Sequence, residues 1–158
     1  DADIECFMYL SMSSIRCKCH GADRESPPGK SALDLAKLAL TSARKSSSRS
    51  LEEVASLHAV AEAQAQQRLY KECSDTALEA LDILNELQAV KEVAILLTNM
   101  ARWYLDAGSA SQAREMAEDA LGYFQAAAAE DDKEVEAVEV ACKVLVALGC
   151  HSKAIHLC

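Results

Sequence analysis

The chain has 158 residues, a formal net charge of −9, 51% hydrophobic residues, much of them alanine, and only 4% aromatic residues. Because alanine is the best helix former, this composition predicts an all-α protein. The acidic charge argues against a nucleic-acid binder and against docking on an anionic membrane, since both need a basic surface, and the lack of any run of about 18 apolar residues argues against a transmembrane helix.

The first two predicted helices are separated by a long loop. Apolar residues at helical spacing predict a helix over residues 3–16. A loop over residues 17–30 follows, and Pro27-Pro28-Gly29 ends it. The second helix begins near Ser31 and ends in the basic, serine-rich tract 45–49.

Two capping boxes predict where further helices begin. In Ser50-Leu51-Glu52-Glu53, the serine side chain can accept a hydrogen bond from the third amide of the helix while Glu53 reaches back, which opens a third helix. The same pattern at residues 109–112 opens a sixth helix. The fifth helix is expected over residues 90–106, with Gly108 as its C-terminal stop.

The fourth, seventh and eighth helices have weaker signals. Ser74 or Asp75 is expected to cap the fourth helix. An alanine-rich and acidic linker over residues 127–133 precedes the seventh helix, which Gly149 ends. An eighth helix begins near Ser152, so the sequence looks truncated at its C-terminal end.

The segment Ala94–Phe124 combines small residues where two helices approach with large residues that fill a groove. It resembles the tetratricopeptide (TPR) repeat, whose spacing is matched by Ala101, Tyr104, Gly108, Ala113 and Ala120. Weaker copies match at Ala65 and Ala77, and at Gly149 and Ala154. The steps from Ala77 to Ala113 and on to Ala154 are 36 and 41 residues, longer than the usual period of about 34. This spacing resembles the longer TPR variety of kinesin light chains.

The resemblance implies an α-solenoid of antiparallel helix pairs. About three and a half repeats are expected over residues 31–158, preceded by a helix and a Cys- and Pro-containing loop in residues 1–30. An ordinary antiparallel helical bundle with alanine-rich seams is the alternative fold.

In a TPR array, the first helix of each pair lines the concave face. The resemblance therefore implies a partner-binding surface made of Glu62, Gln66, Thr98, Asn99, Arg102, Glu136, Glu139 and Lys143. Asn99 and Arg102 resemble part of a clamp for a C-terminal carboxylate, but the neighbouring glutamates would repel that group. We therefore expect a partner surface or helix of basic or mixed charge. Trp103 is expected to pack between repeats, with a partner contact as the alternative.

The sequence contains no convincing catalytic motif, since it has neither a Gly-rich phosphate loop nor a G-x-S-x-G elbow. We expect no enzyme, no cofactor and no metal. Cys17, Cys19 and His20 are soft potential ligands, but their spacing is not that of a zinc knuckle and a fourth ligand is missing. Seven cysteines are an odd number and a poor disulfide framework, which favours a reducing compartment, the cytoplasm or an organelle interior.

These features lead to three hypotheses about function. The first is a non-catalytic scaffold that binds other proteins. The second is an accessory structural subunit of a large multi-protein complex, for example in an organellar membrane. The third is a small thiol- or metal-dependent sensor that uses Cys17, Cys19 and His20.

Overall fold

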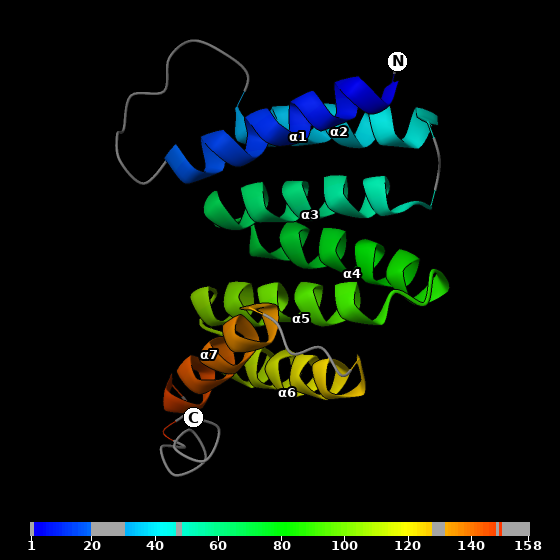
Figure 1. The fold of residues 1–158 in the computed structure, drawn as a ribbon. Helices are drawn as coiled ribbons and strands as arrows, with labels where there is room; N and C mark the ends of the chain where they lie inside the picture. The colour runs from blue at the N-terminus through cyan, green and yellow to red at the C-terminus, as the bar shows by residue number, and fades with distance from the viewer. Residues whose placement is uncertain (1, 20–30, 47–48, 128–131, 148, 150–158) are drawn as a thin grey trace. The chain divides into compact units, whose positions relative to one another are not determined.

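The computed structural model describes residues 2–19, 31–46, 49–127, 132–147 and 149, and nearly all of these are helical (Figure 1). The helices in this described part are α1 (Ala2–Cys19), α2 (Ala32–Ser46), α3 (Leu51–Gln66), α4 (Tyr70–Glu86), α5 (Val90–Asp106), α6 (Ala110–Ala127) and α7 (Asp132–Ala147). No residue in the same ranges is in a strand. The predicted all-α class is confirmed.

The chain divides into two compact units, Asp1–Ile83 and Leu84–Cys158. In the first unit, α1 packs on both α2 and α3, and α2 packs on α3. In the second unit, α5, α6 and α7 pack pairwise against one another. The boundary predicted between residues 30 and 31 stays a prediction, because residues 20–30 lie outside the described part of the chain.

Alanine seams let the helices of the second unit approach closely. One buried cluster joins α5, α6 and α7 and consists of Ala101, Ala113, Ala117, Val140, Ala141 and Val144. A second cluster places Phe124 of α6 against Ala94 of α5, with Ile95 and Leu121 beside them. The small side chains let the helix backbones approach, and the few large ones fill the space that remains between the helices.

The first unit uses a similar seam between α1 and α2. Cys6 is buried with Ala39 and Ala43, and Tyr9 and Leu10 pack against them. The buried Cys6 thiol also lies 3.5 Å from the Ser56 hydroxyl of α3. At the other end of α1, the Ser13 hydroxyl donates to the Ala32 carbonyl over 3.0 Å. One face of α1 is therefore packed against α2 and α3.

Three consecutive interhelical turns share one backbone geometry. Each has a residue at positive φ, and the amide of the following residue donates to a carbonyl five residues earlier, which is the Schellman motif. The positive-φ residues are Arg68 (61°), Gln88 (54°) and Gly108 (79°). The closing bonds are Leu69 N to Gln64 O (2.9 Å), Ala89 N to Leu84 O (3.1 Å) and Ser109 N to Tyr104 O (2.8 Å). The turns recur every 20 residues, so a helix pair has a period of 40 residues.

This 40-residue period corrects the predicted one. The pairing of Ala77 with Ala113, 36 residues apart, is wrong, because the positions that match in the structure are 40 residues apart. The following buried residues correspond across the two pairs α3–α4 and α5–α6: Leu57 and Leu97, Ala61 and Ala101, Cys73 and Ala113, Ala77 and Ala117, Ala80 and Ala120, and Leu84 and Phe124.

The turn geometry also explains why the start of the fourth helix was predicted wrongly. The fourth helix begins at Tyr70, and not after Ser74 or Asp75, which lie inside it. The Leu69 carbonyl accepts the bond from the Cys73 amide over 2.9 Å, so the backbone of the turn itself starts the helix. The prediction for the third helix is confirmed, since Ser50 is its N-cap and accepts from the Glu53 amide over 3.3 Å.

The left-handed turn residues allow a stability prediction. An L-residue with a side chain is strained at positive φ, whereas glycine is not. We expect Gln88→Gly to raise the free energy of unfolding by about 0.5–1 kcal/mol and Gly108→Ala to lower it by about 1 kcal/mol. Urea unfolding followed by circular dichroism measures both. Equal shifts of the same sign in the two variants would contradict the assigned turn geometry.

Candidate partner-binding surface

The residues predicted to bind a partner fall into both units. Glu62 and Gln66 lie on α3, in the first unit. The other six lie on α5 and α7, in the second unit, and these two helices pack against each other. Each group is described by itself in the following paragraphs.

On α5, the predicted polar residues are largely engaged within their own helix. Thr98 and Asn99 are buried. The Thr98 hydroxyl donates to the Ala94 carbonyl (2.9 Å), and the Asn99 amide nitrogen donates to the Ile95 carbonyl (3.1 Å). The half-buried Arg102 donates to the Asn99 side-chain oxygen over 2.7 Å. The Asn99 amide is therefore used in hydrogen bonds within α5.

On α7, the predicted charged residues are exposed and paired. The Lys143 ammonium lies 2.7 Å from the Glu139 carboxylate, one helical turn away. The hydrogen bond from Lys143, together with its charge, holds the pKa of Glu139 below its usual value. Val135 and Val146 are exposed on the same helix. Residues four, seven and eleven positions apart share a helix face, so α7 presents apolar and charged groups side by side. Glu136 also belongs to α7, but its side chain lies outside the described residues.

On α3, Glu62 is half-buried and Gln66 is exposed. The nearby Gln64 is buried, and its side-chain oxygen accepts a hydrogen bond from the Thr76 hydroxyl of α4 over 2.9 Å. Burial, followed by the charge of Glu62, raises the pKa of the Cys73 thiol to about 12. Cys73 therefore stays a protonated packing residue at neutral pH and is not a reactive thiol.

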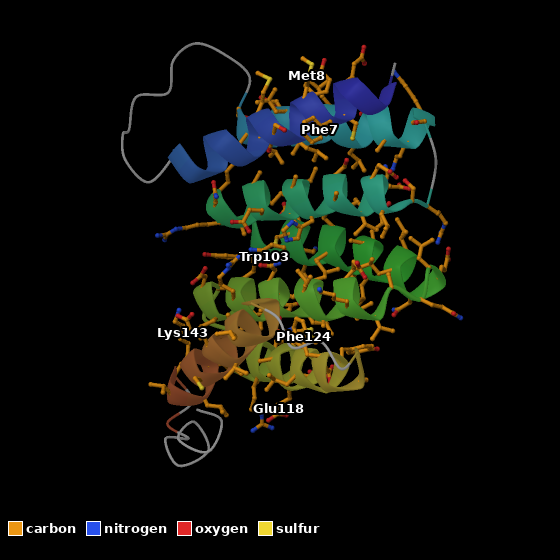
Figure 2. All side chains as sticks on the ribbon, in the orientation of Figure 1. Phe7, Met8, Trp103, Glu118, Phe124 and Lys143 are labelled. Carbon is orange, nitrogen blue, oxygen red and sulfur yellow. The ribbon has the colours of Figure 1, made fainter. Side chains whose placement is uncertain are left out.

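Trp103 is buried on α5 (Figure 2). Its burial agrees with the predicted packing role. The alternative, in which Trp103 anchors a partner, would need an accessible side chain.

The proposed sensor cluster falls mostly outside what the structure describes. Helix α1 continues to Cys19, so Cys17 and Cys19 lie in a helix and not in the predicted loop. Their side chains, and all of His20, lie outside the described residues. Among the residues that are described, no three His, Cys, Asp or Glu side chains are grouped so that they could hold a metal ion. Within the same part of the chain, no helix is both long enough and apolar enough to cross a membrane.

Sequence reasoning missed one ionic cluster, which links three helices of the first unit. The Glu53 carboxylate accepts from the Arg44 side chain of α2 (2.7 Å) and from the Arg49 backbone amide (2.6 Å). Arg44 also pairs with Glu79 of α4. In the predicted capping box Glu53 was expected to reach back to the start of its own helix, but its carboxylate instead joins α3 to α2 and to the turn between them. The capping box and the basic tract 45–49 were sequence signals near this site, but neither indicated a contact with Arg44.

Short turns, antiparallel helix pairs and alanine seams define the TPR-like α-solenoid class, and comparison with solved structures agrees with this assignment. The crystal structure of BtubC (BKLC) from P. vanneervenii, a kinesin-light-chain-like protein of TPR type, superposes on 99% of this chain with a TM-score of 0.79 and 19% sequence identity. The chain spans 61% of the length of that protein. No protein-family model and no curated protein sequence matches the chain. The predicted resemblance to the longer-period TPR fold is confirmed.

Proposed function

We propose that the chain is a non-catalytic scaffold that binds another protein through the exposed surface of α7 and the neighbouring part of α5. TPR-like folds commonly hold protein segments, because stacked helix pairs create an extended surface without a catalytic centre. The BtubC fold supports this class of function in general. The accessory-subunit and sensor hypotheses gain no support from the described residues.

The observation that carries the proposal is the composition of the exposed face of α7. Exposed valines lie beside the Glu139–Lys143 ion pair. Arg102 of α5 adds a half-buried positive charge. Apolar groups can supply affinity to a partner while charges of both signs fix its orientation. This combination fits a partner segment of basic or mixed charge, and not the acidic tail that a carboxylate clamp would bind.

A matched pair of charge reversals tests the proposed surface. Glu139 on α7 and Glu118 on α6 are both exposed, and each is paired with a base one turn away, Lys143 and Arg114 respectively. We expect Glu139→Lys to weaken binding of the partner about fivefold or more, because it repels a basic segment, whereas Glu118→Lys leaves binding unchanged. Quantitative copurification from the native source with each variant as bait measures this.

Two further results bear on the same proposal. Arg102→Glu is expected to change the captured partners in a salt-sensitive way. If Glu139→Lys and Arg102→Glu retain the same partners in the same amounts as the unchanged chain, the binding surface is not on α5 and α7.

A further inference from the structure

The outer face of α1 is apolar, and the described helices that pack on α1, which are α2 and α3, lie against its other face. Phe7 is 73% exposed, Met8 54% and Met12 44%. The opposite face of the same helix carries Cys6 and Ser13, which are buried against α2 and α3. In Figure 2, Met8 lies on the side of α1 turned away from α3. Exposed apolar groups gathered on one helix mark an interaction surface rather than ordinary scatter.

The order of charges along α1 indicates what covers this face. The whole chain has a net charge of −9, but α1 contains two acids and two bases. The acids, Asp3 and Glu5, lie in its first turns, and the bases, Arg16 and Lys18, lie in its last turns. The apolar residues lie between them. If two such helices pair in antiparallel fashion, the acidic end of each meets the basic end of the other, and Met8 of one copy lies beside Met12 of the second.

We propose that the outer face of α1 binds a second copy of this chain, forming a two-fold symmetric dimer with antiparallel α1 helices. Two-fold pairing is the commonest symmetry of homo-oligomers, and it lets one apolar patch cover itself. Because the charges of α1 balance while the whole chain has a net charge of −9, two copies that meet at α1 avoid the repulsion that a face carrying the excess acids would produce. One helix from each copy makes a small interface, so we expect a dissociation constant on the order of tens of micromolar.

Sedimentation equilibrium of the full chain, from about 5 to about 500 μM, tests the proposal because this range brackets the expected dissociation constant. The unchanged chain is expected to pass from monomer to dimer. The double variant Met8→Ser/Met12→Ser is expected to weaken the dimer about tenfold or more. The control Val135→Ser/Val146→Ser, which removes similarly exposed apolar groups from α7, is expected to leave the dimer intact.

A charge exchange tests the antiparallel orientation separately. Glu5→Arg and Arg16→Glu are each expected to weaken the dimer about threefold or more, and the two together are expected to restore it, because the exchanged charges again meet their opposites. Circular dichroism checks that every variant keeps the helical content of the unchanged chain. The proposal would be overturned by any of three results. The chain could stay monomeric at every concentration, or the α7 control could dissociate the dimer while the α1 variant does not. The third result is a double charge exchange that fails to restore the dimer.

Discussion

Replacing Phe124 by alanine is expected to lower the free energy of unfolding of the second unit by about 3–5 kcal/mol. Phe124 is fully buried and fills the space left by Ala94, with Ile95 and Leu121 beside it. Because its neighbours include the smallest core side chain, the site cannot close around the cavity that the truncation leaves. A loss of this size is a large fraction of the total stability of a typical domain, about 5–15 kcal/mol.

Tyr123 provides the matched control, since it is the adjacent aromatic residue on α6 and is partly exposed. We expect Tyr123→Ala to cost less than about 1 kcal/mol, because its ring already contacts water. Urea unfolding of both variants, followed by far-ultraviolet circular dichroism, measures the difference. If Phe124→Ala costs no more than Tyr123→Ala, the packing of α6 on α5 is not as described.

The second large effect is expected at Glu53, whose side chain is only 6% exposed. Burial raises the pKa of this carboxyl, but hydrogen bonds from Arg44 and from the Arg49 amide, together with the charge of Arg44, outweigh burial and lower its pKa below the ordinary value of 4.5. Glu53→Gln removes the negative charge and replaces one of the two accepting oxygens by an NH2 group, which then faces either the Arg44 side chain or the Arg49 amide as donor against donor. We expect it to lower the free energy of unfolding by about 2 kcal/mol near neutral pH.

The lowered pKa of Glu53 also fixes the direction of a pH effect. A carboxyl with a lower pKa in the folded state contributes stability above its unfolded pKa, and this contribution is lost as the pH falls through the folded pKa. The difference in free energy of unfolding between the unchanged chain and Glu53→Gln should therefore be largest near neutral pH and should shrink below pH 4.5. Urea unfolding at several pH values measures this difference.

Glu79→Gln is the control for Glu53→Gln. It alters the exposed second partner of the same arginine, and exposed ion pairs contribute little, about 0–1 kcal/mol. Two results would show that the buried carboxylate does not link the helices. One is a difference in free energy of unfolding between the unchanged chain and Glu53→Gln that does not depend on pH. The other is a Glu79→Gln variant that is as unstable as Glu53→Gln.

The sequence predicted those parts of the fold whose signals are local. The fifth helix at residues 90–106, the N-cap at Ser50 and the stop at Gly108 each follow from a short pattern, and all three agree with the structure. The start of α4 was missed because Arg68, in the turn before it, takes the positive φ that glycine takes at Gly108, and Gln88 does the same in the turn before α5. Neither residue type signals a left-handed turn, so the 40-residue period was hidden.

The candidate site was harder to predict, because a helical period gives the face of a residue but not its accessibility. Thr98 and Asn99 were placed on a binding face, yet both are buried with their polar groups bonded to their own helix. Glu53 was assigned a capping role from its local pattern. Its main partner, Arg44, lies on another helix, and no local pattern indicates such a contact.

Site-specific photo-cross-linking tests the central claim, that a protein partner binds on α7, most directly. A photoreactive residue is placed at Lys143 or, as control, at Glu118, which lie on α7 and α6 (Figure 2) and whose side chains are 63% and 57% exposed. Each chain is illuminated in an extract of the native source, and adducts are identified by mass spectrometry. We predict a partner adduct from position 143 and none from position 118. An adduct from position 118 with none from position 143 would contradict the proposed binding surface.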